Sequence, residues 1–220
     1  HAAVPGFAAM LSSKKAYGFF LPQISTVHAW GHQKPAWMKL QDVLFLNNVS
    51  AVHAVSHDVT EFLAKEGVKR SLISPIYNGY DFSRIDQFLN NEEERGKEIF
   101  CEKKRKQFCI GTVAGMSGRK GIIYLVDAVA NLSPSLLENL QVILVGDGPD
   151  LEKLKYRVEE LGLKDIIEFP GFTPNPFKYM KKFDLFVLPS LSEGLPVTLV
   201  EAMYLKIPVL TTDVQGNREI

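Results

Sequence analysis

Residues 185–205 read Leu-Phe-Val-Leu-Pro-Ser-Leu-Ser-Glu-Gly-Leu-Pro-Val-Thr-Leu-Val-Glu-Ala-Met-Tyr-Leu and contain the signals of a strand, a loop and a helix, in that order. The uninterrupted apolar run at 185–188 is typical of a strand that is covered on both faces of a parallel sheet. A helix is expected from Pro196, because proline is tolerated in the first turn of a helix. The segment therefore predicts one strand–helix unit of a parallel sheet.

Similar units are predicted on either side of this segment. Further apolar runs of strand length lie at 23–29, 51–56, 71–76, 109–114, 141–145, 166–169 and 208–212, and helical patterns cover 120–131 and 150–161. Strands and helices in repeating order predict right-handed βαβ units, and so an α/β fold with open parallel sheets. In such sheets, ligands bind beyond the carboxyl ends of the strands.

The chain is expected to contain two α/β domains. Asn78-Gly79 is a strong turn signal, and the stretch 90–106 is polar and charged. We therefore predict a first domain over 1–80, a hinge or linker over 81–107, and a second domain over 108–220. The chain opens on His1 and ends at Ile220, shortly after a predicted strand. We expect the first domain to be only partly present and the second to lack its last helices.

Composition excludes several classes of function. The 25 basic and 25 acidic residues give a formal net charge of zero, so nothing favours a nucleic-acid partner. The cysteines are Cys101 and Cys109, too few for a disulfide scaffold, which indicates a reducing compartment. No apolar run reaches the roughly 18–20 residues that span a bilayer, and no signal peptide is visible. These observations predict a cytoplasmic protein.

The loop and helix of the opening segment carry the residues most suggestive of chemistry. Free backbone N–H groups at the helix start, near Pro196, would suit a diphosphate. Glu193 lies in the loop and Glu201 about one and a half turns into the helix. A carboxylate beside a phosphate would repel it, so both are expected to accept hydrogen bonds from hydroxyls of a ribose or sugar. On spacing alone, an ordinary helix with a favourable early acid fits equally well.

The Glu193-x7-Glu201 segment resembles the defining motif of retaining GT-B glycosyltransferases of the group 1, sucrose-synthase-like type, known as family 4. Other segments are similar to runs of that family in the same order, namely residues 25–28, 52–56, 76–81, 144–149 and 161–171. The resemblance implies two Rossmann-like domains. Residues 1–80 would then be part of the acceptor-binding domain, and 108–220 would be the domain that binds the nucleotide sugar.

The resemblance also implies roles for individual residues. Glu201 would bind the ribose hydroxyls and Glu193 the hydroxyls of the transferred sugar. His28 would face that sugar from the acceptor domain. Backbone groups would make the remaining sugar, phosphate and base contacts, at Gly194, Leu195, Val197, Thr198 and Phe172.

The diphosphate contact departs from the family pattern. Lys120 matches the family's diphosphate lysine, but the arginine that the family commonly has five residues earlier is Gly115 in this chain. Arg119 is a candidate substitute, and the pattern leaves open whether it fills that role.

The sequence predicts neither a metal nor a cofactor other than the nucleoside diphosphate sugar as co-substrate. His28/His32 and His53/His57 have a spacing that binds metals on a helix, but both pairs fall on predicted strands and loops. Gly146-x-Gly148 lacks the third glycine of a dinucleotide fingerprint. The absence of any Asp-x-Asp argues against a metal-chelated nucleotide sugar.

We therefore predict transfer of a sugar to an acceptor hydroxyl, with retention, in surface polysaccharide or glycolipid synthesis. The resemblance implies a sugar, polysaccharide or lipid-linked acceptor, with peripheral contact at the inner face of the membrane. The alternatives are an epimerase or phosphorylase of the same fold, and a truncated nucleotide-binding module without turnover.

Overall fold

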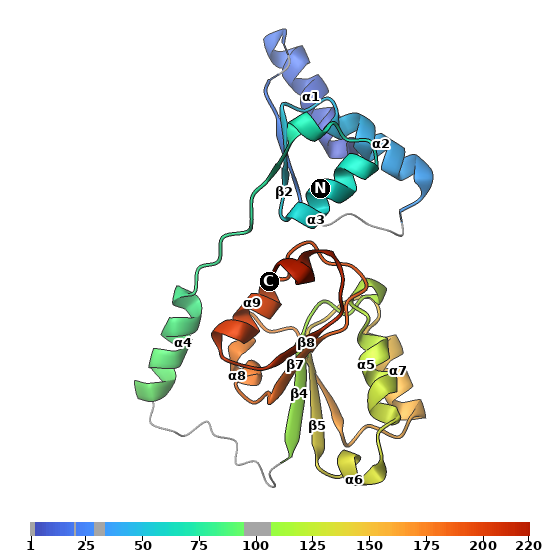
Figure 1. Cartoon of the computed structure of the whole chain (residues 1–220), viewed down its shortest axis with the longest axis vertical. Helices are drawn as coiled ribbons and strands as arrows, with labels where there is room; N and C mark the ends of the chain where they lie inside the picture. Colours follow the sequence, from blue (N-terminus) through green and yellow to red (C-terminus); the bar gives the residue numbers. More distant parts are fainter. Residues whose placement is uncertain (1–2, 20, 29–33, 95–106) are drawn as a thin grey trace. The chain divides into compact units, whose positions relative to one another are not determined.

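The computed structural model describes residues 3–19, 21–28, 34–94 and 107–220 (Figure 1). His32, Cys101 and most of the charged stretch 90–106 lie outside the described residues. The chain divides into two compact units. The first comprises residues 1–79 with two later segments, 192–196 and 213–220, and the second comprises residues 80–191 and 197–212.

The first unit contains a parallel sheet in the order β1-β2-β3. Its described elements are α1 (Ala3–Tyr17), β1 (Ile24–Val27), α2 (Ala36–Leu46), β2 (Ala51–Ala54), α3 (His57–Lys65), the 3-10 turn η1 (Arg70–Leu72) and β3 (Ile73–Pro75). The central strand β2 and helices α2 and α3 supply most of the core, including Phe45, Leu46, Val52, Val59 and Leu63. From the C-terminal segment, the 3-10 turn η3 (Gln215–Glu219) also belongs to this unit.

The second unit contains a parallel sheet in the order β6-β5-β4-β7-β8. The strands are β4 (Phe108–Val113), β5 (Leu140–Val145), β6 (Ile167–Gly171), β7 (Leu185–Leu188) and β8 (Val209–Thr211). The first strand of this unit, β4, lies at the centre of the sheet, and the chain then adds β5 and β6 on one side. It then returns to add β7 and β8 on the other. The sheet therefore has its topological switch point between β4 and β7, where open α/β sheets bind ligands.

Helices cover both faces of this sheet (Figure 1). They are α5 (Ile122–Ala130) and α7 (Leu151–Glu160) on one face, and α8 (Phe177–Met180) and α9 (Val197–Tyr204) on the other. Along β5, Val142 and Leu144 pack with α5 and α7, while Ile143 and Val145 pack into the opposite cluster. Because successive strand residues point to opposite faces, an uninterrupted apolar run is what a doubly covered strand requires.

Each predicted strand is present, with ends that differ by at most two residues from those expected. The linker predicted over 81–107 is wrong in its first half, where α4 (Ser83–Glu94) forms. Ile85 is fully buried, and Phe88 and Leu89 pack against the same core cluster of the second unit. These residues lie at positions i, i+3 and i+4 of one helix face, and the charged residues around them hid that pattern.

Candidate functional site

The loops that follow β4 and β7 touch each other at the switch point of the second sheet. The N–H of Leu191 donates to the carbonyl oxygen of Arg119 over 2.8 Å. Gly121 has a φ of +63°, and a Cβ at this position would lie 2.0 Å from the carbonyl oxygen of Pro189. Only glycine fits both the left-handed backbone and this close approach. The structure therefore brings together residues 114–121, here called the Lys120 loop, and the start of the loop 190–196.

Arg119 and Lys120 share a three-residue 3-10 turn, η2 (Gly118–Lys120), which directly precedes Gly121 and α5. Both side chains are half-buried. Gly115, the position where the family commonly has arginine, is exposed in the loop after β4. The two cations of this loop are thus carried by one turn rather than by two separated positions.

The Gly146-x-Gly148 pattern serves loop packing after β5. A Cβ on Gly146 would lie 2.0 Å from the carbonyl oxygen of Ala114, and one on Gly148 would lie 2.5 Å from that of Met116. The buried Met116 also donates its N–H to the carbonyl of Asp147 over 2.9 Å. These glycines are therefore required by the approach of two loops, which accounts for the incomplete dinucleotide pattern.

Glu201 is the fifth residue of α9, and only 8% of its surface is exposed. The hydroxyl of Tyr80 donates a hydrogen bond to Glu201 Oε1 over 2.5 Å. Burial raises the pKa of Glu201, while the Tyr80 hydrogen bond and the charge of Arg84 act in the opposite direction. The net result is a carboxyl group that is harder to ionise than an exposed glutamate, and its position is fixed by the hydrogen bond from the Tyr80 hydroxyl.

Tyr80 is itself fixed by aromatic neighbours. Its ring lies 4.7 Å from that of Phe82, which stacks on Tyr204 at 4.1 Å. The Tyr204 hydroxyl donates to Asp86 over 2.7 Å. The sequence singled out residues 76–81 only as a family-like run, so the contact between Tyr80 and Glu201 was missed.

Residues 192–196 group with the first unit, where they lie against His28. A Cβ on Gly194 would be 1.6 Å from the carbonyl oxygen of His28, so the two backbones are in direct contact. Leu195 packs against the core that contains Val52 and Leu63. Glu193 is buried, with 4% of its surface exposed, whereas His28 is exposed. The loop residue that follows Glu193 thus lies against the backbone of His28, the other residue predicted as catalytic.

The remaining predicted residues lie at carboxyl-edge positions of the second unit. Val197 and Thr198 are the first two residues of α9, exposed and half-buried respectively. Phe172 directly follows β6, and 75% of its surface is exposed. A hollow of about 590 Å³ beside α7 and β6 contains none of the predicted site residues.

The described residues contain no group of three or more His, Cys, Asp or Glu that could hold a metal ion. His53 lies in β2 and His57 begins α3, so this pair does not share a helix. Cys109 is buried in β4. Among the described helices, none has the length and apolar character needed to cross a membrane.

Known proteins resemble this chain in both sequence and fold. A family model for Glycosyltransferase Family 4 matches residues 1–84. The putative teichuronic acid biosynthesis glycosyltransferase TuaC of Bacillus subtilis is 31% identical over 225 residues, which cover 98% of this chain and 52% of TuaC. A UDP-Gal:alpha-D-GlcNAc-diphosphoundecaprenol alpha-1,3-galactosyltransferase of Escherichia coli is 29% identical over 66% of this chain and 38% of its own length.

The chain thus spans about half, or less, of the length of these relatives. The crystal structure of Anabaena Alr3699/HepE in complex with UDP and glucose superposes with a TM-score of 0.78 at 23% identity, over 99% of this chain and 59% of that one. This likeness confirms the predicted GT-B type of α/β fold. A family model for the group 1 glycosyl transferases matches residues 91–220, and the chain therefore belongs to that family.

Proposed function

We propose that the protein transfers a sugar from a nucleoside diphosphate sugar to an acceptor hydroxyl, with retention of the anomeric configuration. The observation that carries this proposal is the contact between the Lys120 loop and the loop leading into α9. The Leu191–Arg119 hydrogen bond and the Gly121–Pro189 approach hold these loops together. Membership in the group 1 family supports the same reaction.

The diphosphate leaving group gathers negative charge as the glycosidic bond breaks. The ammonium of Lys120 and the free N–H groups of Val197 and Thr198 are the groups of the second unit that stabilise this charge. Arg119, on the same turn as Lys120, is the candidate second cation. Since positive groups are already supplied by the protein, we propose that the reaction needs no metal ion and no further cofactor.

The two buried glutamates bind hydroxyl groups in this proposal. An ionised carboxylate only accepts hydrogen bonds, and bonds to a charged acceptor are stronger than neutral ones. Glu201 takes the ribose hydroxyls, and Glu193 takes those of the transferred sugar together with the backbone of Gly194 and Leu195. His28 faces that sugar, and the main chain beside Phe172 meets the base.

The acceptor that we propose is a lipid-linked or polysaccharide hydroxyl at the inner face of the membrane. The relative from Escherichia coli carries a diphosphoundecaprenol acceptor and a UDP-linked donor in its name. TuaC is named for teichuronic acid biosynthesis. UDP-sugars and an undecaprenyl-diphosphate-linked acceptor are accordingly the first substrates to test.

Sugar transfer by the full-length protein is expected to proceed at the same rate in excess chelator and with added magnesium. The physical reason is that Lys120 and the start of α9 supply the positive charge that a metal would otherwise provide. The measurement is the initial rate of product formation from a UDP-sugar, with the anomeric configuration of the product read by NMR.

Loss of transfer in chelator, restored by magnesium or manganese, would contradict metal independence. Turnover that requires free phosphate would identify a phosphorylase, and interconversion of the donor sugar without acceptor would identify an epimerase. Nucleotide binding without any turnover would identify a binding module.

As the pH is lowered, nucleoside diphosphate affinity is expected to be lost at a higher pH in a Tyr80→Phe variant than in the wild type. The Tyr80 hydroxyl donates to the Glu201 carboxylate and so lowers its pKa. Removing that hydroxyl moves the pKa of Glu201 further up, and protonation then takes away an acceptor for the ribose hydroxyls. The affinity is measured by calorimetry between pH 5 and pH 8.

Tyr204→Phe is the matched control, because the Tyr204 hydroxyl bonds to Asp86 rather than to Glu201. Titration of the nucleotide's own phosphate is the same in all three proteins and cancels in the comparison. Equal pH profiles for Tyr80→Phe and Tyr204→Phe would exclude the proposed link between Tyr80 and nucleotide binding.

A further inference from the structure

The C-terminal turn η3 supports the loop that carries Glu193. A Cβ on Gly216 would lie 1.6 Å from the carbonyl oxygen of Gly194, so the turn and the loop are in backbone contact. The hydroxyl of Ser192 also donates to the side-chain oxygen of Gln215 over 3.0 Å. Both contacts lie within the first unit, and they flank Glu193 on either side. The position of this loop therefore depends on where η3 is held.

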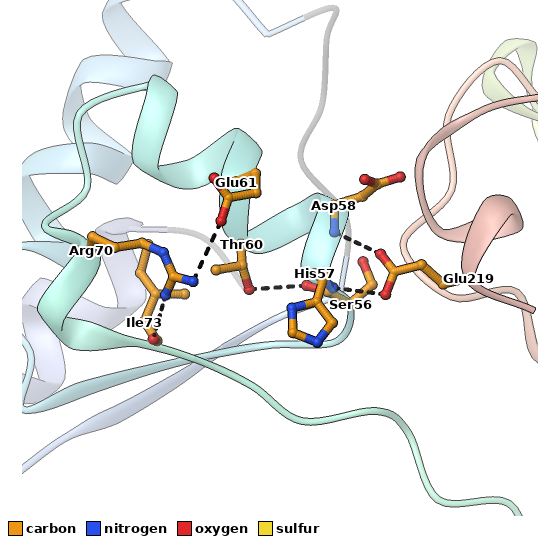
Figure 2. Close-up of polar contacts among 8 residues, drawn as sticks. All are labelled: Ser56, His57, Asp58, Thr60, Glu61, Arg70, Ile73 and Glu219. Carbon is orange, nitrogen blue, oxygen red and sulfur yellow. Dashed lines mark hydrogen bonds and ion pairs between the residues drawn. The ribbon is translucent and has the colours of Figure 1, made fainter.

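Glu219, the last residue of η3, binds the start of helix α3 (Figure 2). Its carboxylate accepts from the N–H of His57 over 2.9 Å and from that of Asp58 over 2.6 Å. The hydroxyl of Tyr77 donates to the same carboxylate over 2.7 Å. The three bonds join residues 142 to 162 positions apart, so they fix η3 to the fold of the first unit.

The partners of Glu219 are groups that need an acceptor. The first N–H groups of a helix have no partner within the helix itself. In α3 the Ser56 side chain accepts from Val59, and Glu219 accepts from the two N–H groups before it. A negative charge is also favoured at this end of the helix dipole. A carboxylate therefore suits this position better than a neutral polar side chain does.

Glu219 keeps its charge at neutral pH. Burial alone would raise the pKa of its carboxyl group, but the N–H groups of Asp58 and His57 and the Tyr77 hydroxyl outweigh that effect. The pKa of Glu219 thus lies below the usual value for glutamate. The three hydrogen bonds consequently persist over the neutral pH range.

We propose that Glu219 is a positioning residue that fixes the loop 192–196, and with it Glu193, by joining η3 to the start of α3. This rests on the proposed function, in which Glu193 contacts the transferred sugar. In this proposal Glu219 acts on the loop and not directly on the substrate. Its influence reaches Glu193 through the Gly216–Gly194 and Ser192–Gln215 contacts.

The test compares Glu219→Gln with Glu61→Gln in the full-length protein. Glu61 lies on the same helix, is exposed, and pairs only at 3.4 Å with Arg70, so its replacement removes a charge without touching η3 (Figure 2). In Glu219→Gln, amide hydrogen exchange of residues 192–195 is expected to be about 10-fold faster, because a charge-assisted bond is lost. The rate of sugar transfer is expected to fall by about the same factor.

Affinity for the free nucleoside diphosphate should fall by a smaller factor than turnover does, since Glu201 and Tyr80 lie outside the loop 192–196. Glu61→Gln should change none of these quantities. Tyr77→Phe removes one of the three bonds and should shift exchange and turnover in the same direction by a smaller factor, even if Glu219→Gln folds poorly.

Unchanged exchange of residues 192–195 in Glu219→Gln would overturn the proposal, as would an equal loss of nucleotide affinity and turnover. The exchange measurement decides this without any catalysis. If the wild type transfers no sugar while the loop still loosens in Glu219→Gln, then the proposed function fails and the positioning of the loop stands.

Discussion

Glu201→Gln is expected to weaken binding of the free nucleoside diphosphate by about 10- to 100-fold, whereas Glu193→Gln spares that binding and lowers turnover by a similar factor. The ribose is common to the nucleotide and the nucleotide sugar, so losing its partner affects both ligands. The transferred sugar is present only in the donor, so losing its partner affects only turnover. A hydrogen bond to a charged group contributes roughly 1.5–3 kcal/mol, which sets the size of both effects.

Both substitutions keep the volume of the side chain, which limits packing changes at two buried positions. Binding is measured by calorimetry with the free nucleotide, and turnover by initial rates with the donor. If the two variants weaken free-nucleotide binding equally, or if neither does, the assigned roles are wrong. If both glutamates were only structural, the melting temperature would fall while activity per folded molecule stayed unchanged.

Gly121→Ala is expected to destabilise the second unit by about 3 kcal/mol, against about 1 kcal/mol for Gly162→Ala. Both glycines have a φ between +60° and +70°, so the left-handed backbone destabilises alanine by the same amount at each position. Only at Gly121 would the new Cβ meet a backbone oxygen, that of Pro189 at 2.0 Å, whereas nothing lies within 4 Å at Gly162. Gly162 is therefore a matched control for the collision.

The free energy of unfolding is measured by urea denaturation. The dependence of that free energy on urea concentration should be the same in both variants and the wild type. Nucleotide affinity should fall in Gly121→Ala as well, because Lys120 is its immediate neighbour, and should hold in Gly162→Ala. Equal losses of stability at the two positions would mean that the Lys120 loop can move away from Pro189 without cost. The observed loop contact would then carry little weight in the donor site.

The strands could be predicted because each leaves a local signal in the sequence. A doubly covered strand such as β5 needs an apolar residue at every position, and few other structures produce that run. Helix α4 gave a weaker signal, since its apolar residues Ile85, Phe88 and Leu89 stand among charges in a segment that reads as a linker. Here tertiary packing against the second core decided the structure, and local composition did not.

For the candidate site, the sequence predicted which elements carry the glutamates, but not which side chains meet. The spacing of Glu193 and Glu201 correctly placed one in a loop and the other inside a helix. The bond from Tyr80 to Glu201 joins residues 121 positions apart, and that of Glu219 to α3 joins residues more than 160 apart. No periodicity connects such positions, because which side chains meet depends on the completed fold. Long-range partners of this kind become visible only in the structure.

The first compact unit is discontinuous in the chain, and this bears on how the protein folds as it is synthesised. Its three strands lie within residues 1–79, but residues 192–196 and 213–220 complete it. At a translation rate of roughly 5–20 residues per second, these late segments leave the ribosome on the order of 10 s after β3. During that interval the start of α3 lacks the carboxylate of Glu219. The second unit therefore has time to begin forming before the segment 213–220 can join the first unit.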